Sequence, residues 1–185
     1  MRIYPHAELV GILSQVTAID NDAVPLFLLM AFCGVRQVEF RKMLWEHVDA
    51  PNYMLTFPQK VYGSSRRTPI PLDAGNWIDL YKSEYGEDPV YPIYDMDGMW
   101  RVVGEKVGHQ CPGTLRDSYI AYALAAGEPV DELSKATGEA NLERYKGLAT
   151  RKDAVLWFTT TRDDIPVIKP GKVKWWQEKK DGESG

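Results

Sequence analysis

Cysteine is scarce in this sequence, and its placement excludes two kinds of protein. Only Cys33 and Cys111 occur among 185 residues, so the chain has no disulfide framework of the kind that stabilises small secreted domains. Neither cysteine has a partner at the spacing of a metal site. We therefore expect free or buried thiols in a reducing cytoplasm, and no metal ion.

Long hydrophobic runs are also missing. The longest apolar run, residues 24–35, ends at Arg36, well short of the roughly 20 residues that span a bilayer. The first residues include Pro5, His6 and Glu8, which do not fit a secretion signal. The sequence thus predicts a cytoplasmic protein without a membrane-spanning segment.

A basic surplus is absent as well. The 22 lysines and arginines are outnumbered by 26 acidic residues, which gives a formal net charge of −4. Proteins that bind nucleic acids usually carry excess positive charge, because they neutralise phosphates. Basic residues can nevertheless cluster on one face. An acidic helical interaction protein with no DNA role is therefore one hypothesis that the composition leaves open.

The residues that are present suit one globular domain. Hydrophobic residues make up 44% and charged residues 26% of the chain, as is typical of soluble globular proteins. A chain of this length normally forms a single core. We assign residues 1–164 to this domain and residues 165–185, rich in Pro, Lys and Trp, to a partly flexible C-terminal arm.

The spacing of apolar residues predicts a mainly helical α+β fold. Residues 6–17 place their apolar side chains on one helix face, and residues 24–32 are apolar nearly all round, as in a buried helix. Two β-compatible runs, 53–57 and 68–72, flank a Gly-Ser-Ser turn and predict an antiparallel hairpin or three-stranded sheet. The Pro- and Gly-rich stretch 86–98 is expected to be a loop. Further helices are expected at 37–47, 73–85, 101–107, 115–126, 129–136, 141–148 and 151–158.

Three residues far apart in the chain suit one reaction, the breaking and rejoining of a phosphodiester. That reaction needs a nucleophile and cations beside the phosphate oxygens, and the planar group of arginine can bind two oxygens at once. Arg36 follows the buried helix directly, Arg116 lies in the segment 113–119, and Tyr145 lies in the segment 142–148.

The segments around these residues resemble the catalytic domain of the tyrosine recombinases, the phage-integrase family. Residues 31–49 are similar to its first signature box, with a Gly-x-Arg-x-x-Glu turn at 34–39. Residues 114–119 resemble the second box, and residues 144–158 resemble the nucleophile helix and the turn after it. The resemblance covers about residues 4–158 and implies a mainly helical fold with a small antiparallel sheet.

The resemblance also implies roles for particular residues. Arg36 and Arg116 would hold the scissile phosphate, and Tyr145 would attack it to form a 3′-phosphotyrosine and release a 5′-hydroxyl. Because this intermediate conserves the bond energy, neither ATP nor another cofactor is needed. Lys60, the nearest match to the family's hairpin lysine, would give a proton to the leaving oxygen, and Glu39 would orient Arg36. Family members act on double-stranded DNA as tetramers, so both are expected here.

Further basic residues are expected to contact DNA. Arg66 and Arg67 could replace Lys60 at the hairpin or contact the DNA backbone, and Lys146 is assigned to the backbone as well. Ordinary roles stay open beside these: Arg36 could pair with Glu39 or with another acidic residue, and Lys60 could be a solvated surface lysine.

Three positions depart from the family pattern. Gly113 stands where the second box begins with histidine, Asp117 stands where another histidine follows Arg116, and Glu139 stands where histidine or tryptophan precedes the nucleophile. His109 could compensate by reaching into the site. The sequence therefore leaves two hypotheses: an active site-specific recombinase or integrase, or a degenerate, catalytically impaired fold that binds DNA or a partner.

Overall fold

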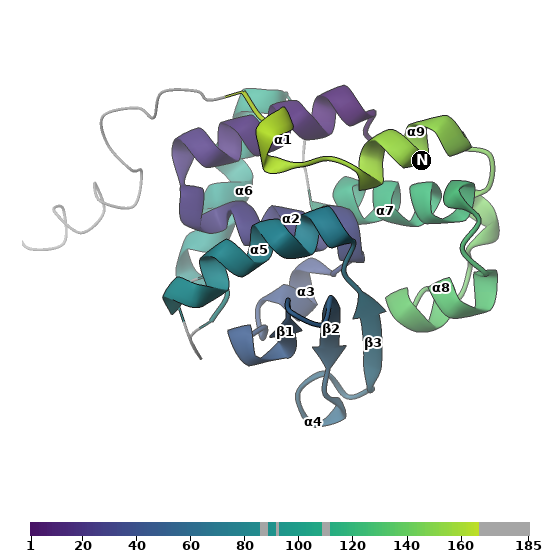
Figure 1. Cartoon of the computed structure of the whole chain (residues 1–185), viewed down its shortest axis with the longest axis horizontal. Helices are drawn as coiled ribbons and strands as arrows, with labels where there is room; N and C mark the ends of the chain where they lie inside the picture. The colour runs from purple at the N-terminus through teal and green to yellow at the C-terminus, as the bar shows by residue number, and fades with distance from the viewer. Residues whose placement is uncertain (86–88, 92, 109–111, 167–185) are drawn as a thin grey trace, which may run out of the picture.

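A computed structural model describes residues 1–85, 89–91, 93–108 and 112–166 of the chain. The structure is mainly helical with one small antiparallel sheet (Figure 1), which confirms the predicted α+β class. None of the helices in these ranges is long and apolar enough to cross a membrane. The α-helices are α1 His6–Ile19, α2 Val24–Cys33, α3 Gln37–Phe40, α4 Gln59–Tyr62, α5 Leu72–Tyr85, α6 Ile93–Val107, α7 Pro112–Ala126, α8 Val130–Thr137 and α9 Arg151–Phe158. The 3₁₀ turns are η1 Asn21–Ala23, η2 Trp45–His47, η3 Glu143–Tyr145 and η4 Arg162–Asp164, and the strands are β1 Val48–Asp49, β2 Met54–Phe57 and β3 Arg66–Pro69.

Helix α2 is the centre of the fold. All 10 of its residues are apolar and buried, as expected for a helix with neighbours on every side. It packs against α7, α5 and α1. The indole of Trp157 in α9 donates a hydrogen bond to the carbonyl of Ala31 at 2.9 Å and stacks on Tyr122 of α7 with ring centroids 4.6 Å apart. These contacts hold α7 and α9 against the end of α2, where Arg36 follows.

The small sheet carries the next part of the site. Its strand order is β1-β2-β3, and in the antiparallel pair of β2 and β3 Phe57 lies opposite Arg66. Helix α8 packs beside β3 (Figure 1). The hydroxyl of Thr68 in β3 donates to the carbonyl of Ala136 in α8 at 2.7 Å. Helix α8 thereby covers a strand that would otherwise be an open edge of the sheet.

The predicted helix at 37–47 is wrong beyond its first turn. Helix α3 ends at Phe40, and the turn η2 begins only at Trp45. Between them the chain pairs with a distant segment: the amide of Val90 donates to the carbonyl of Met43 at 3.2 Å, and Leu44 forms an isolated bridge with Pro89. Long-range pairing thus overrides the local apolar spacing.

The predicted loop at 86–98 is wrong from Ile93 onward, because α6 begins there and runs to Val107. Met96, Met99 and Val103 of this helix are buried, and their spacing of three and four residues is helical. The high content of Pro, Gly and Tyr in the preceding stretch obscured this pattern.

Two further boundaries differ from the prediction. The segment 141–148 forms only the 3₁₀ turn η3 rather than a helix, and the second long strand lies at Arg66–Pro69 rather than at 68–72. Of the predicted C-terminal arm, only Ile165 and Pro166 belong to the described residues. The rest of the arm lies outside them.

Candidate active site

Arg36 lies at the junction of α2 and α3. Gly34 ends α2 in the left-handed conformation with φ of 63°, and the extended Arg36 then starts α3. The carboxylate of Glu39 accepts a hydrogen bond from the Arg36 amide at 2.8 Å and pairs with its guanidinium at 3.4 Å. The same guanidinium donates to the carbonyl of Gly138 at 2.7 Å. Arg36 therefore joins α3 to the C-terminal end of α8.

Arg66 reaches the same carboxylate from the sheet. Its two terminal nitrogens donate to the two oxygens of Glu39 at 3.0 and 2.8 Å, and its Nε donates to the carbonyl of Ala136 at 3.1 Å. The guanidinium also lies over the ring of Phe57, 3.5 Å from the centroid. Burial lowers the pKa of Arg66 to about 10, Glu39 opposes this change, and the charge of Arg36 adds to it. Arg66 is therefore a buried neighbour of Arg36.

Arg116 approaches from α7. Its side chain is 11% exposed and pairs with Glu139 at 3.4 Å, and it donates to the carbonyl of Thr137 at 3.3 Å. Its buried Nε has no hydrogen-bond acceptor among the residues that the structure describes. Arg116 also contributes to the electrostatic lowering of the pKa of Arg66. Arg116 therefore pairs with a carboxylate that lies beyond α8 in the sequence.

Three arginines thus meet at the C-terminal end of α8. The carbonyls of Ala136, Thr137 and Gly138 each accept a hydrogen bond from one of them. The C-terminal end of a helix carries partial negative charge, so these carbonyls hold cations well. The arginines come from three separate elements, the α2–α3 junction, β3 and α7, and only the tertiary structure unites them.

Tyr145 is connected to this cluster through a chain of polar contacts. Its ring is fully buried, and its hydroxyl donates to Asp117 Oδ1 at 2.8 Å. The same hydroxyl oxygen accepts a hydrogen bond from Arg144 Nη2 at 2.7 Å. Arg144 also pairs at 3.2 Å with Glu139 Oε2, the atom that pairs with Arg116. The phenol hydroxyl therefore belongs to the same network as Arg116 rather than to an unrelated surface.

Glu139 is the central acidic group of this network. One of its oxygens accepts from both Arg116 and Arg144, while the amide of Asn141 donates to the other at 3.4 Å. The sequence singled out this residue as a departure from the family pattern. In the fold it neutralises two arginines that could otherwise bind an anion.

The remaining predicted residues lie around the cluster rather than in it. Lys60 is exposed on α4, which connects β2 and β3, and Lys146 pairs with Glu143 at 2.6 Å. Arg67 follows Arg66 on β3, and because side chains alternate along a strand it faces a different side and lines a groove. His109 lies outside the described residues.

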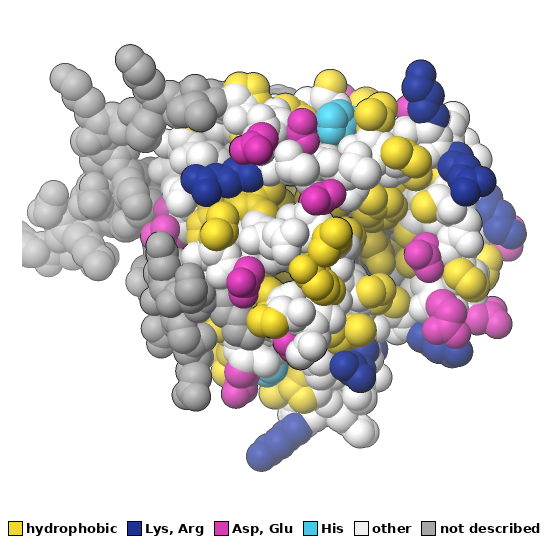
Figure 2. All heavy atoms as spheres, in the orientation of Figure 1, with side chains coloured by type: hydrophobic (Ala, Val, Ile, Leu, Met, Phe, Trp, Pro, Cys, Tyr) yellow, Lys and Arg dark blue, Asp and Glu magenta, His cyan; other side chains and the backbone are white. Residues whose placement is uncertain are grey.

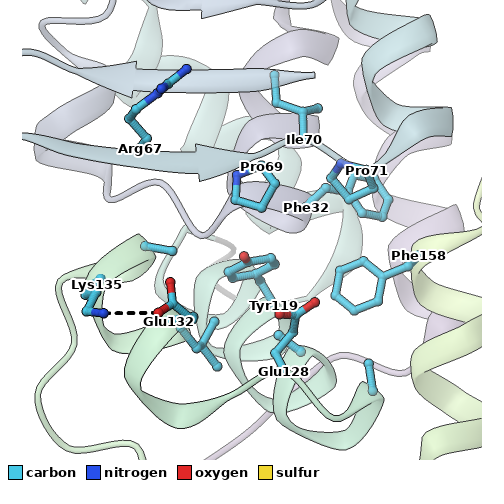
Figure 3. A pocket seen from close by; sticks show the side chains of 14 residues that line it. Phe32, Arg67, Pro69, Ile70, Pro71, Tyr119, Glu128, Glu132, Lys135 and Phe158 are labelled. Atoms are coloured by element: carbon cyan, nitrogen blue, oxygen red, sulfur yellow. Dashed lines mark hydrogen bonds and ion pairs between the residues drawn. The ribbon is translucent and has the colours of Figure 1, made fainter. Parts of the chain in front are cut away.

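The groove beside Arg67 lies between β3 and the helices α7, α8 and α9. It has a volume of about 590 Å³, within the usual range for ligand pockets. Figure 3 shows Tyr119 and Phe158 on one side, facing Phe32 and Pro69 on the other. In Figure 2 a recess with hydrophobic side chains appears on this side of the molecule, with charges of both signs around it. Ala136 of α8 belongs to both regions, because it lines the groove and its carbonyl accepts from Arg66.

Sequence reasoning missed two residues of the site. Arg144 was not considered, and Asp117 was treated only as a departure from the family pattern, yet both bind the hydroxyl of Tyr145. The one signal in the sequence was adjacency, because Asp117 follows Arg116 and Arg144 precedes Tyr145. Among the residues that the structure describes, no group of three or more His, Cys, Asp or Glu side chains could hold a metal ion.

Comparison with known proteins places this geometry in a structural context. No model of a protein family matches the sequence, and no curated protein matches it either. Several solved structures are similar to it in fold, and three of them illustrate the match. The catalytic domain of bacteriophage HP1 integrase matches with a TM-score of 0.63 and 12% identity, over 80% of this chain and 86% of that one. XerA recombinase matches with a TM-score of 0.60 and 14% identity, over 100% of this chain and 64% of that one. The Tn1549 transposon integrase in complex with transposon right end DNA matches with a TM-score of 0.64 and 14% identity, over 83% of this chain and 64% of that one. The chain thus spans less than two thirds of the XerA and Tn1549 chains.

Proposed function

We propose that this chain, which has the fold of the tyrosine-recombinase catalytic domains, breaks and rejoins double-stranded DNA through a 3′-phosphotyrosyl intermediate on Tyr145. The observation that carries the proposal is the convergence at the end of α8. Arg36, Arg66 and Arg116 gather there, and the hydroxyl of Tyr145 is joined to Arg116 through Arg144 and Glu139.

The proposed reaction uses these groups in distinct roles. Arg36 and Arg116 hold the non-bridging oxygens of the scissile phosphate and stabilise the charge that builds on them. The Tyr145 oxygen attacks phosphorus, the bond to the 5′ oxygen breaks, and the 3′ end stays on the protein. Attack by the free 5′-hydroxyl reverses the step and rejoins the strand without an external energy source.

The basic residues around the cluster complete the proposal. Lys60, exposed at the tip of the sheet, would supply a proton to the leaving 5′ oxygen, while Arg67 and Lys146 would contact the DNA backbone. Glu39 would orient Arg36, as its two contacts with that residue support. Self-association on paired DNA sites is part of the proposal and follows from the family resemblance.

A second candidate function is a degenerate module that binds DNA or a partner without cutting. The observation that favours it is the carboxylate of Glu139, which already pairs with Arg116 and Arg144 where a phosphate would need them. The exposed Gly113, whose missing side chain would meet open space, offers no proton acceptor in place of a histidine.

A covalent-trapping experiment separates the two candidates. The protein is incubated with duplex DNA that carries a nick beside the cleavage position, so that the released fragment diffuses away and the adduct accumulates. We expect an adduct from the wild type and none from Tyr145→Phe. Tyr53→Phe removes a hydroxyl that donates to Asn76, away from the arginine cluster, and should react normally. DNA binding without any adduct would favour the second candidate.

The same assay tests the two phosphate-binding arginines. Arg36→Lys and Arg116→Lys keep the charge but lose the planar group, so we expect adduct yields at least about 100-fold lower, as is typical when one stabilising donor is removed. Circular dichroism and urea unfolding check that each variant is folded. Wild-type yields from folded variants would contradict the assignment.

A further inference from the structure

We propose that Asp117 is a catalytic residue that takes the proton of Tyr145 during attack, and that Arg144 stabilises the phenol oxygen as it gains charge. This inference rests on the proposed function and deepens it. It assigns proton transfer to Asp117 and charge stabilisation to Arg144, two roles that the family resemblance did not supply.

The geometry of the phenol hydroxyl supports the two roles. The hydroxyl has one proton, and it points to Asp117 Oδ1 at 2.8 Å. Its oxygen accepts a hydrogen bond from Arg144 Nη2 at 2.7 Å, and the Arg144 guanidinium lies 4.9 Å from the centre of the Tyr145 ring. The reacting oxygen is thus held between a proton acceptor from α7 and a cationic donor on its own turn. The distance from Arg144 is that of a charge-assisted hydrogen bond, and the distance to Asp117 is that of an ordinary O–H···O hydrogen bond.

Asp117 is well placed because it follows Arg116 directly on α7. The residue that would hold the phosphate and the residue that would take the proton are therefore fixed by one helix. That helix is itself packed against α2 and α9. A base must lie within hydrogen-bond reach of the proton that it removes, and Asp117 already meets this condition without DNA.

The proton and bond changes balance in this scheme. The Tyr145 O–H bond breaks, its proton moves to Asp117 Oδ1, and the phenol oxygen forms the new bond to phosphorus. The bond from phosphorus to the 5′ oxygen breaks, and that oxygen takes a proton from solvent water or from Lys60. In the rejoining step the 5′-hydroxyl gives its proton back to water or to Lys60, and its oxygen forms the bond to phosphorus. The bond from phosphorus to the phenol oxygen breaks, and that oxygen leaves as an anion beside Arg144 and recovers its proton from Asp117.

The electrostatics explain why an acceptor is needed. Burial raises the pKa of Tyr145, the hydrogen bond to Asp117 raises it further, and the hydrogen bond from Arg144 lowers it. The charged groups facing the phenol are Asp117 from α7 and Arg144 on η3, with Glu139 and Arg116 beyond Arg144. Because the phenol stays protonated at neutral pH, attack requires that its proton leave while the new bond forms.

The kinetic test uses two substitutions at the phenol. Asp117→Asn keeps the size and an oxygen acceptor but is not a base, and Arg144→Gln keeps a donor without the charge. In single-turnover trapping with nicked DNA, we expect adduct formation by Asp117→Asn to be at least about 100-fold slower, the usual contribution of general base catalysis, with unchanged DNA affinity. Glu143→Gln, a neighbouring exposed carboxylate, is the control and should react like the wild type.

A second measurement does not depend on catalysis. Fluorotyrosine is incorporated throughout, and the ¹⁹F resonance of Tyr145 is identified by its loss in Tyr145→Phe. Titration with base should give a lower pKa for Tyr145 in Asp117→Asn and a higher one in Arg144→Gln than in the wild type, with circular dichroism confirming the fold at each pH. Unchanged values would overturn the contacts on which the inference rests.

The outcomes separate this inference from the proposed function. A wild-type chain that forms no adduct would overturn the proposed function and the catalytic step together. An adduct that forms equally fast or faster in Asp117→Asn would overturn the inference alone, because Asp117 would then only hold the tyrosine in place. Slower reaction with the expected shifts in pKa would support it.

Discussion

At the scale of single residues, two glutamates set the electrostatic state of the site. Glu39 and Arg66 are 12% and 8% exposed, so this pair is largely buried and needs both partners to avoid an uncompensated charge. Glu139 is 17% exposed and bridges two arginines from different elements. Glu39 organises the arginines, whereas Glu139 competes with any phosphate that they would bind.

The protonation state of Glu139 follows from its surroundings. Burial by itself would raise its pKa, but the hydrogen bond from the Asn141 amide and the charges of Arg144 and Arg116 lower it below the ordinary value. The carboxylate is therefore charged at neutral pH. The charged Glu139 side chain stabilises the folded state fully above the pKa that it has in the unfolded chain, about 4.3. This stabilisation is lost as the pH falls through the lower pKa of the folded state.

Removal of this charge should strengthen DNA binding. Two unit charges about 5 Å apart repel by roughly 3 kcal/mol at an effective dielectric near 20 and by under about 1 kcal/mol in water. We therefore expect Glu139→Gln to bind duplex DNA between about 4-fold and 100-fold more tightly at pH 7, measured by fluorescence anisotropy at fixed salt. Glu143→Gln removes a nearby exposed charge and should have a smaller effect. Equal affinities of the two variants would show that Glu139 does not oppose DNA.

At the scale of elements, the end of α2 is the most constrained position near the site. Gly34 adopts φ of 63°, and a Cβ there would lie 2.5 Å from Cδ1 of Tyr119. Tyr119 is 6% exposed, and its ring packs edge-on against Phe158 at 6.1 Å, so it cannot move aside easily. The position therefore requires glycine for two reasons, the backbone conformation and the close approach of α7.

Gly34→Ala should be strongly destabilising. The left-handed conformation costs roughly 1–2 kcal/mol for a residue with a Cβ, and overpacking of a core adds roughly 1–3 kcal/mol. Gly63→Ala is a matched control, because Gly63 has φ of 78° but nothing within 4 Å of its Cβ position, so only the first cost applies. Urea unfolding should show the larger loss for Gly34→Ala. Equal losses of unfolding free energy in the two variants would mean that α7 can move away from α2 at no cost, so that the close approach of Tyr119 does not require glycine.

At the scale of the whole molecule, charge is spread without a basic surplus. The net charge is −4, and the face seen in Figure 2 carries both signs. The arginines of the cluster are moreover paired with carboxylates of the same chain. DNA binding would therefore depend on a few local cations rather than on a broad positive field.

The salt dependence of DNA affinity tests this view. Each phosphate contact contributes about −0.9 to the slope of log affinity against log salt concentration. We expect Lys60→Ala, Arg67→Ala and Lys146→Ala each to make the slope shallower by about 1. Arg101→Ala, on α6 at the opposite side of the fold from α8 (Figure 1), should leave it unchanged. A flat slope for the wild type would exclude phosphate contacts altogether.

The sequence by itself determined the fold class, the buried helix α2 and the identity of Arg36, Arg116 and Tyr145 as candidates. Local apolar spacing carries the information on the fold class and on α2, because it depends only on near neighbours along the chain. The three candidates follow instead from the resemblance of their segments to the tyrosine recombinases. The predictions for α6 and for the end of α3 were wrong. The Pro- and Gly-rich composition before α6 hid its start, and pairing with residues 89–90 ended the helix that begins with α3.

Only the tertiary structure decided what the candidate residues contact. The α2–α3 junction, β3 and α7 bring their arginines to the end of α8, and α7 brings Asp117 to the hydroxyl of Tyr145. These partners are separated by 21 to 102 residues in the sequence, so no local pattern encodes them. Hydrogen bonds and ion pairs depend on distances between atoms, and those distances are fixed when the helices pack.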